Sequence, residues 1–123
     1  MHTGAALPVA SETIAVKEAV KIISEKGFGC IALVNAEGVL TGLITDGDIR
    51  RNLSDGLLDK PAGAIMTKSP RTAGDGLLVA EAMAIMNGLK DSQRKITALI
   101  VVDAANKPVG LLHLHDCLRA GFA

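Results

Sequence analysis

The chain has 123 residues, of which 13 are basic and 13 acidic, so its formal net charge is zero. Apolar residues make up 49 % of it, which excludes a disordered chain. A neutral chain without Trp or Tyr lacks the clustered cations and stacking platforms of nucleic-acid-binding proteins, so we expect no nucleic-acid partner. No apolar run is long enough to span a bilayer and no secretory signal is evident, which predicts a cytoplasmic location without a membrane partner.

An internal repeat organises the chain. Residues 30–35 align with residues 98–103 at an offset of 68, and residues 42–48 align with residues 110–116 at the same offset. A unit of about fifty residues buries too little surface to fold alone. We therefore expect the two copies to pack sheet against sheet around a shared core.

The first copy predicts a helix, two strands and a second helix. Apolar residues at helical spacing predict a helix from Val16, and Gly27 is typical of the residue that ends one. The continuous apolar run 30–34 predicts a buried strand. After a turn, we expect a second strand over 39–45 and a short helix over 46–53.

The second copy predicts the same order: a helix over 79–86, strands over 97–102 and 109–113, and a helix over 114–120. Pro61 and Pro70 mark the linker between the copies. The prediction is an α/β fold of two pseudo-symmetric helix–strand–strand–helix units with packed small sheets. It divides the chain into a connecting segment 1–7, a first unit 8–58, a linker 59–69 and a second unit 70–123.

A polar motif stands at the junction between the second strand and the second helix. Thr45 and Asp48 have the spacing of a capping box, in which both side chains satisfy free N–H groups of the helix. The same groups could instead recognise a ligand, because a helix start attracts phosphate and a carboxylate accepts hydrogen bonds from ribose hydroxyls. Gly42 lets a ligand or a partner strand approach the backbone closely. Three arginines follow the junction acids and form a solvated helix face or reach a ligand phosphate: Arg50, Arg51 and Arg119.

Two other chemistries receive less support. The Asp-x-Asp motif at 46–48 after an apolar strand is found in aspartate-nucleophile phosphatases, but the chain is too short for their fold and lacks their downstream acidic pair. His113 and His115 could form a metal pair, but no convincing third ligand is nearby, so we expect no metal. Cys30 and Cys117 lie in apolar stretches, and we expect reduced core residues.

The two copies, each with a Gly-apolar-apolar-x-x-x-Asp motif, and the residues 65–70 resemble a pair of cystathionine-β-synthase (CBS) domains over most of the chain. The resemblance implies a pseudo-symmetric module whose interdomain clefts hold adenosine nucleotides. By position, it implies ligand contacts from Thr45 and Asp48 in the first copy and from His113 and Asp116 in the second. The segments before each first helix and the starts of the first strands also line such clefts, here Thr13, Ile14, Gly29, Cys30, Leu78 and Ala98. Since aromatics are scarce, a base would lie between aliphatic groups such as Ile14 and Leu43.

The motifs at 45–51, 110–116 and 118–121 also resemble the C-terminal half of D-arabinose-5-phosphate isomerases. That family converts ribulose 5-phosphate to arabinose 5-phosphate for Kdo (3-deoxy-D-manno-octulosonate) and lipopolysaccharide synthesis. Its catalytic N-terminal sugar-isomerase domain is absent here. The resemblance implies a non-catalytic regulatory region whose effector is CMP-Kdo or an adenosine nucleotide (AMP or ATP). The implied partners are the sugar-isomerase domain of a parent chain and a second copy in a homodimer. The alternatives are a structural dimerisation module with empty clefts and a stand-alone adenosine-nucleotide sensor.

Overall fold

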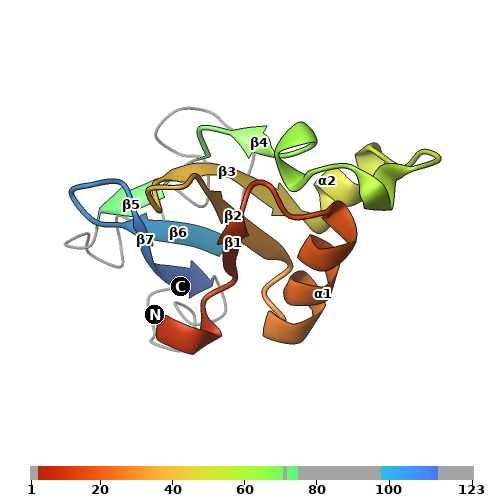
Figure 1. Ribbon diagram of the computed structural model, residues 1–123. Helices are drawn as coiled ribbons and strands as arrows, with labels where there is room; N and C mark the ends of the chain where they lie inside the picture. The colour runs from red at the N-terminus through yellow and green to blue at the C-terminus, as the bar shows by residue number, and fades with distance from the viewer. Residues whose placement is uncertain (1–2, 71, 75–97, 114–123) are drawn as a thin grey trace, which may run out of the picture.

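Two small β-sheets form the centre of the fold in the computed structural model, which describes residues 3–70, 72–74 and 98–113 (Figure 1). The first sheet has the strand order β1 (Val9–Ser11), β2 (Cys30–Val34), β3 (Leu40–Thr45) and β4 (Thr67–Lys68). The second has the order β5 (Thr72–Gly74), β6 (Ala98–Val102) and β7 (Pro108–His113). In each sheet the first strand runs parallel to the second, and the later pairs are antiparallel.

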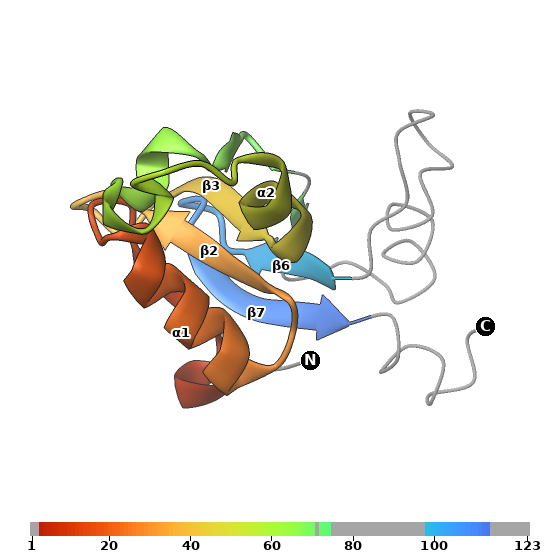
Figure 2. The ribbon, with the colours of Figure 1, turned by 90° about the vertical axis from the view of Figure 1, so that its right-hand side faces the viewer.

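The helix α1 (Val16–Lys26) covers one face of the first sheet (Figure 2). Its buried residues Ala19 and Ile23 pack against an apolar cluster on the sheet, which contains Ile31, Leu33 and Ile44. Gly27 ends the helix with φ 78°, and its N–H donates to the carbonyl of Ile23 at 3.0 Å. A left-handed residue at this place is most easily a glycine, because it has no Cβ. The predicted helix and its end are both confirmed.

The opposite face of the first sheet packs on the second sheet, as Figure 2 shows for β2 in front of β6 and β7. Successive side chains of a strand point to opposite faces. In β2, Ile31 and Leu33 therefore contact α1, whereas Cys30 and Ala32 contact the second sheet. This double burial explains the continuous apolar run of β2. One buried cluster joins the two sheets and contains Cys30, Ala32, Leu40, Ile100, Val102 and Leu111. The predicted packing of sheet against sheet around a shared core is confirmed.

The repeat extends to individual hydrogen bonds in the two hairpin turns. Asn35 Oδ1 accepts from the N–H groups of residues 37 and 39, both at 3.0 Å. Asp103 Oδ1 accepts from the N–H groups of residues 105 and 107, at 2.9 and 3.0 Å. Each hairpin also has a register shift at the equivalent place, between Leu33 and Val34 in the first and between Val101 and Val102 in the second. The same short sequence pattern therefore builds the same hairpin twice.

The turn before β7 also fastens the two sheets together. The N–H of Leu40 donates to the carbonyl of Asn106 at 2.9 Å, and Asn106 Nδ2 donates to the carbonyl of Leu40 at 3.4 Å. Asn106 has φ 60°, a left-handed conformation that asparagine tolerates better than most residues. The sheets are thus joined by polar contacts at one edge as well as by the core.

Several short elements differ from the prediction. Strands β1, β4 and β5 were not expected; with two or three residues each, they are too short to show an alternating pattern. β4 joins the first sheet and β5 the second, although both lie close to the prolines of the linker. The helix α2 (Asp46–Arg51) ends two residues before the expected limit. Single 3-10 turns occupy η1 (Gly4–Ala6), η2 (Leu57–Asp59) and η3 (Ala62–Ala64). The helices expected over 79–86 and 114–120 lie outside the described residues.

None of the helices in the described part of the chain has the length and apolar content that crossing a membrane requires.

Candidate functional site

The junction between β3 and α2 is a complete capping box. Thr45 ends β3 and caps α2, with its Oγ1 accepting from the N–H of Asp48 at 3.2 Å. In return, Asp48 Oδ2 accepts from the N–H of Thr45 at 2.9 Å. The capping interpretation of this motif is therefore confirmed. Since the α2 start is capped from within the chain, the expected phosphate at that helix start has no support here.

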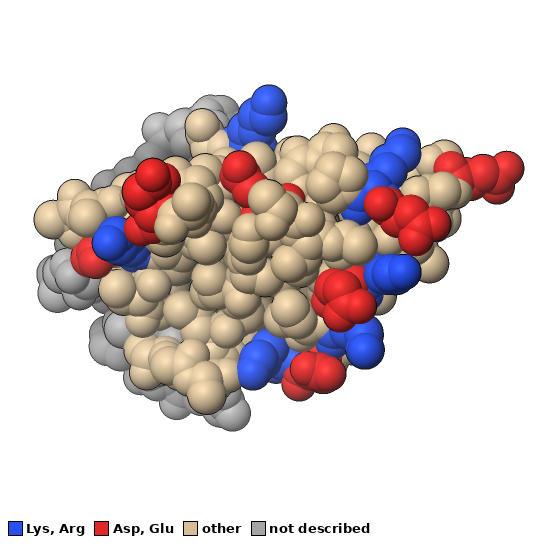
Figure 3. Space-filling view, viewed as in Figure 1, with Lys and Arg blue, Asp and Glu red and all other residues tan. Residues whose placement is uncertain are grey.

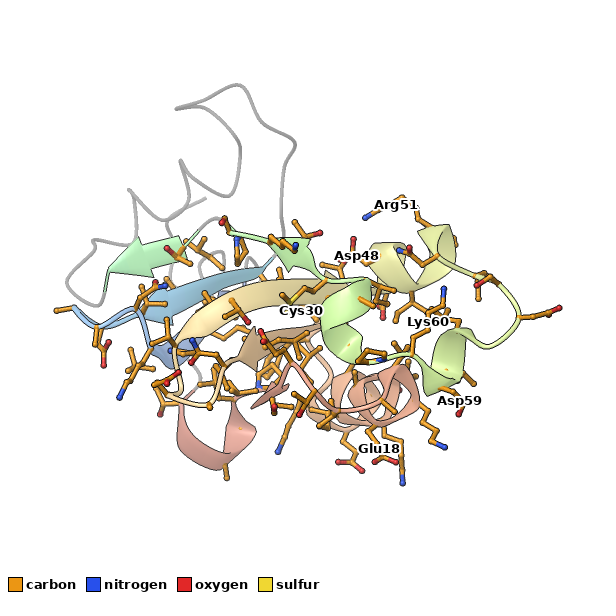
Figure 4. The ribbon with its side chains drawn as sticks, turned by 45° about the horizontal axis from the view of Figure 1, so that its top comes forward. Glu18, Cys30, Asp48, Arg51, Asp59 and Lys60 are labelled. Carbon is orange, nitrogen blue, oxygen red and sulfur yellow. The ribbon has the colours of Figure 1, made fainter. Side chains whose placement is uncertain are left out.

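The carboxylate of Asp48 has further partners. Its Oδ2 also accepts from the Thr45 hydroxyl at 3.1 Å, and its Oδ1 accepts from the Thr67 hydroxyl at 3.2 Å and from the guanidinium of Arg51. Asp48 is only 5 % exposed, and it is the one buried charged side chain in the described ranges. Figure 4 shows Asp48 and Arg51 close together on α2. The site is thus a buried anion held by one cation, two hydroxyls and one backbone N–H.

The linker supplies one of these hydroxyls through β4. Thr67 pairs with Leu43 of β3, which brings the Thr67 hydroxyl to Asp48. Gly42 makes this pairing possible, because a Cβ at Gly42 would overlap the side chain of Met66. The sequence left two roles open for Gly42, the close approach of a ligand or of a partner strand. The structure shows the close approach of Met66 and β4.

Gly29 and Cys30 lie beside the same junction. Cys30 pairs with Thr45 across β2 and β3, and the carbonyl of Gly29 accepts from the N–H of Asp46 at 3.2 Å. Cys30 is only 3 % exposed, which confirms the expected core position. Burial, and secondly the Asp46 carboxylate, raise the pKa of the Cys30 thiol to about 11. The other cysteine that we expected in the core, Cys117, lies outside the described residues.

The second junction brings residues of the two copies together. His113 ends β7 opposite Ala98, the first residue of β6. The ring of Phe28, which precedes β2 in the first copy, lies 6.2 Å from the His113 ring between centroids, with 43° between the ring planes. Phe28 was not among the predicted site residues; its place beside Gly29 and its rarity as an aromatic were the available signals. The structure does not describe the other two second-copy candidates, Leu78 and Asp116.

Of the two further candidates, Thr13 lies away from the first junction, whereas Ile14 packs in the same apolar cluster as Ile44 and Ile49. Thr13 follows β1 at the end where Ser11 pairs with Val34, the opposite end of β2 from Cys30. The exposed Thr13 hydroxyl bonds to the Ser11 hydroxyl at 2.8 Å. Ile14 packs against the α1 side of the first sheet, whereas Leu43 packs on the side of the second sheet. The structure therefore does not place Ile14 and Leu43 on two sides of one base.

A hollow of about 530 Å³ opens near this distant end, where β3 begins and the linker passes it. Its lining includes Glu12, Thr41, Lys68 and Ser69, and none of the predicted ligand contacts that the structure describes. On the face that Figure 3 shows, basic and acidic side chains are interspersed and form no single basic patch.

Comparison with known proteins identifies the family. The pattern of the CBS domain matches residues 4–55 and 62–123, nearly the entire chain in two copies. The chain is 38 % identical over 123 residues to the arabinose 5-phosphate isomerase KdsD of Pseudomonas aeruginosa. This match covers 98 % of the chain but only 36 % of the enzyme, so the chain spans about a third of the length of this curated relative.

Solved structures agree with the fold. The CBS-pair protein CBSX2 from Arabidopsis thaliana superposes with a TM-score of 0.80 at 24 % identity, over 98 % of this chain and 89 % of that one. The CBS domain pair of the protein MJ0100, in complex with 5′-methylthioadenosine and S-adenosyl-L-methionine, superposes with a TM-score of 0.79 at 26 % identity, over 97 % and 90 % of the two chains. Together with the two-fold repeat and the paired sheets, these matches show that the chain belongs to the CBS domain family and is a tandem pair of such domains.

Proposed function

We propose that this CBS pair is the non-catalytic regulatory region of an arabinose 5-phosphate isomerase and that it binds a nucleotide or nucleotide-sugar. The similarity to KdsD over almost the whole chain supports the link to that enzyme. In this proposal, a separate sugar-isomerase domain of the parent protein converts ribulose 5-phosphate to arabinose 5-phosphate. The candidate effectors are CMP-Kdo, which is the activated end product of the pathway, and an adenosine nucleotide such as AMP or ATP.

The observation that carries the proposal is the buried carboxylate of Asp48. Two of its hydrogen bonds come from hydroxyl groups, those of Thr45 and Thr67. The 2′ and 3′ hydroxyls of a ribose offer the same donors with the spacing that one carboxylate accepts. Both ligands of the MJ0100 CBS pair contain such a ribose, which supports a ribose-containing ligand here.

Regulation follows if the ligand prefers one arrangement of the parent enzyme. A ligand shifts an equilibrium only through its different affinities for the two states. The contact between Phe28 and His113 supports a cleft with walls from both CBS domains, so a ligand there would respond to their relative position. We further propose that two modules associate as a homodimer and transmit the change to both subunits.

A second candidate is a purely structural module with empty clefts. It is favoured by one specific observation: the Asp48 carboxylate already has hydrogen-bond partners within its own chain. In that case Asp48 and Thr45 serve only to cap α2.

Thermal unfolding with candidate ligands separates the two functions. We expect one of CMP-Kdo, CMP, AMP or ATP at millimolar concentration to raise the melting temperature. A ligand at a hundredfold excess over its Kd stabilises the folded chain by about 2.7 kcal/mol. Asp48→Asn should lose this increment, whereas Asp55→Asn, which removes the same charge from an exposed site, should retain it. If none of the four ligands shifts the unfolding of the wild-type chain, the structural module is the correct function. A full ligand response in Asp48→Asn would exclude the proposed role of the carboxylate.

A further inference from the structure

We infer that Arg51 competes with the ribose hydroxyls of a ligand for the Asp48 carboxylate, so that the site favours ligands with a phosphate over ligands with a ribose alone. This inference rests on the proposed function, because it concerns the same carboxylate.

The acceptor capacity of Asp48 is fully used. An ionised carboxylate has about four acceptor positions, two on each oxygen. The N–H and hydroxyl of Thr45 occupy those of Oδ2, and the Thr67 hydroxyl and the Arg51 guanidinium occupy those of Oδ1. A ribose diol can therefore bind both oxygens only if one donor leaves each of them.

On Oδ2, only the hydroxyl of Thr45 can leave, because the N–H belongs to the capped backbone. It can be replaced by a ribose hydroxyl, which is the same kind of donor. On Oδ1, the charged donor is Arg51, and it holds the carboxylate more strongly than a neutral hydroxyl does. The Arg51 side chain is half-exposed, whereas that of Asp48 is buried, so the guanidinium is the part that can swing into solvent. A neutral nucleoside must compete with this ion pair.

Gly47 leaves room for the Arg51 guanidinium in its position beside Asp48. A Cβ placed on Gly47 would lie 3.1 Å from Arg51 Nη1 and 3.6 Å from Thr45 Oγ1. The contact with Nη1 is tighter than normal packing, so a side chain at residue 47 would require the Arg51 guanidinium to shift by a few tenths of an ångström and would weaken its contact with Asp48. The glycine in the middle of the Thr45–Asp48 motif thus permits the competing ion pair. Figure 4 shows the Arg51 side chain on α2 directed toward Asp48.

A phosphate changes the balance. When a nucleoside diol displaces Arg51, the guanidinium is left in solvent. A nucleotide can instead offer its phosphate, to which the planar guanidinium can donate two hydrogen bonds. Arg51, which competes with a nucleoside, then contacts the phosphate of a nucleotide. The inferred ligand class is therefore a ribose with a nearby phosphate, which both candidate effectors contain.

The test compares each nucleoside with its 5′-monophosphate, using adenosine with AMP and cytidine with CMP. Affinities for the intact chain are measured by titration calorimetry in the wild type, Arg51→Ala, Gly47→Ala and the control Arg50→Ala. Arg50 is exposed on the same helix and has no ion pair among the described residues. Its replacement by Ala changes the net charge by the same amount as Arg51→Ala. Unfolding without ligand verifies that each variant is folded.

Arg51→Ala should bind the nucleoside about fivefold more tightly, the effect of an ion pair with one exposed partner. It should also lose most of the preference for the monophosphate. Gly47→Ala should improve the binding of both, because Arg51 is displaced but still present. Arg50→Ala should resemble the wild type.

Two outcomes overturn the inference in distinguishable ways. If the wild type binds these ligands but Arg51→Ala leaves nucleoside affinity unchanged or weakened, the competitor role is wrong and the proposed function stands. If neither the wild type nor any variant binds any of the four ligands at millimolar concentration, the inference and nucleotide sensing through these ligands both fail.

Discussion

The ring of Phe28 from the first CBS domain lies against the ring of His113 from the second, with 6.2 Å between their centroids. These residues are 85 positions apart in the sequence. The contact joins the start of β2 to the end of β7 and supplements the apolar cluster between the two sheets. The two domains should therefore unfold and respond to ligands together.

Leu111→Ala tests the shared core. Leu111 of β7 is fully buried and packs with residues of both sheets. We expect a loss of 2–5 kcal/mol, roughly the cost of such a cavity. The whole chain should unfold in one transition, followed by circular dichroism in urea. Amide exchange should accelerate in β2 as well as in β6. Accelerated exchange in β5, β6 and β7 alone would contradict a common core.

Gly42→Ala tests the packing of the linker on β3. The added methyl group meets the Met66 side chain, so we expect a loss of about 1–3 kcal/mol, typical of overpacking. Met66→Ala should recover part of this loss in a double-mutant cycle. Gly74→Ala is the matched control, because a Cβ there meets no atom of the described residues within 4 Å. Equal effects of the two glycine substitutions would contradict the proposed close approach.

Thr45→Ala tests the contribution of the capping box to stability. Removing the hydroxyl takes the cap from α2, and we expect a loss of about 1 kcal/mol without any ligand, measured by urea unfolding. Thr13→Ala removes an exposed hydroxyl bonded only to Ser11 among the described residues, and its effect should remain within about 0.5 kcal/mol. If Thr45→Ala is neutral for stability, the capping box contributes nothing to the fold.

Stability should fall at alkaline pH because of Cys30. The pKa of this thiol is about 11 in the folded chain against 9.0 as the ordinary value. The unfolded chain therefore releases the proton first, and stability is complete below pH 9 and declines between about pH 9 and pH 11. The slope in that window should approach about 1.4 kcal/mol per pH unit. Cys30→Ala should flatten this part of the profile. An unchanged alkaline slope in that variant would show that other groups cause the decline.

Much of the fold was accessible from the sequence because the repeat provides each prediction twice. The apolar run at β2 and the Asn35 and Asp103 turns have strong local signals, and both are found in the structure. The short strands β1, β4 and β5 have no such signal, because two or three residues show no periodicity. Tertiary pairing alone makes them strands.

The site was less accessible for a related reason. The spacing of Thr45 and Asp48 indicated a capping box, but spacing could not show that Thr67 and Arg51 also reach the same carboxylate. Thr67 arrives through the β3–β4 pairing, and the guanidinium of Arg51 lies where a side chain at Gly47 would crowd it. Likewise, the meeting of Phe28 and His113 depends on how the two copies pack. Such contacts between distant segments are fixed by the fold rather than by local sequence.

The most direct measurement is a crystal structure of the chain with the nucleotide that most raises its melting temperature. The account predicts that the 2′ and 3′ hydroxyls of the ribose lie within hydrogen-bond distance of Asp48 Oδ1 and Oδ2, with Arg51 moved from the carboxylate toward the phosphate. A nucleotide bound elsewhere, for instance in the hollow between Thr41 and Lys68, with the Arg51–Asp48 pair intact, would contradict it.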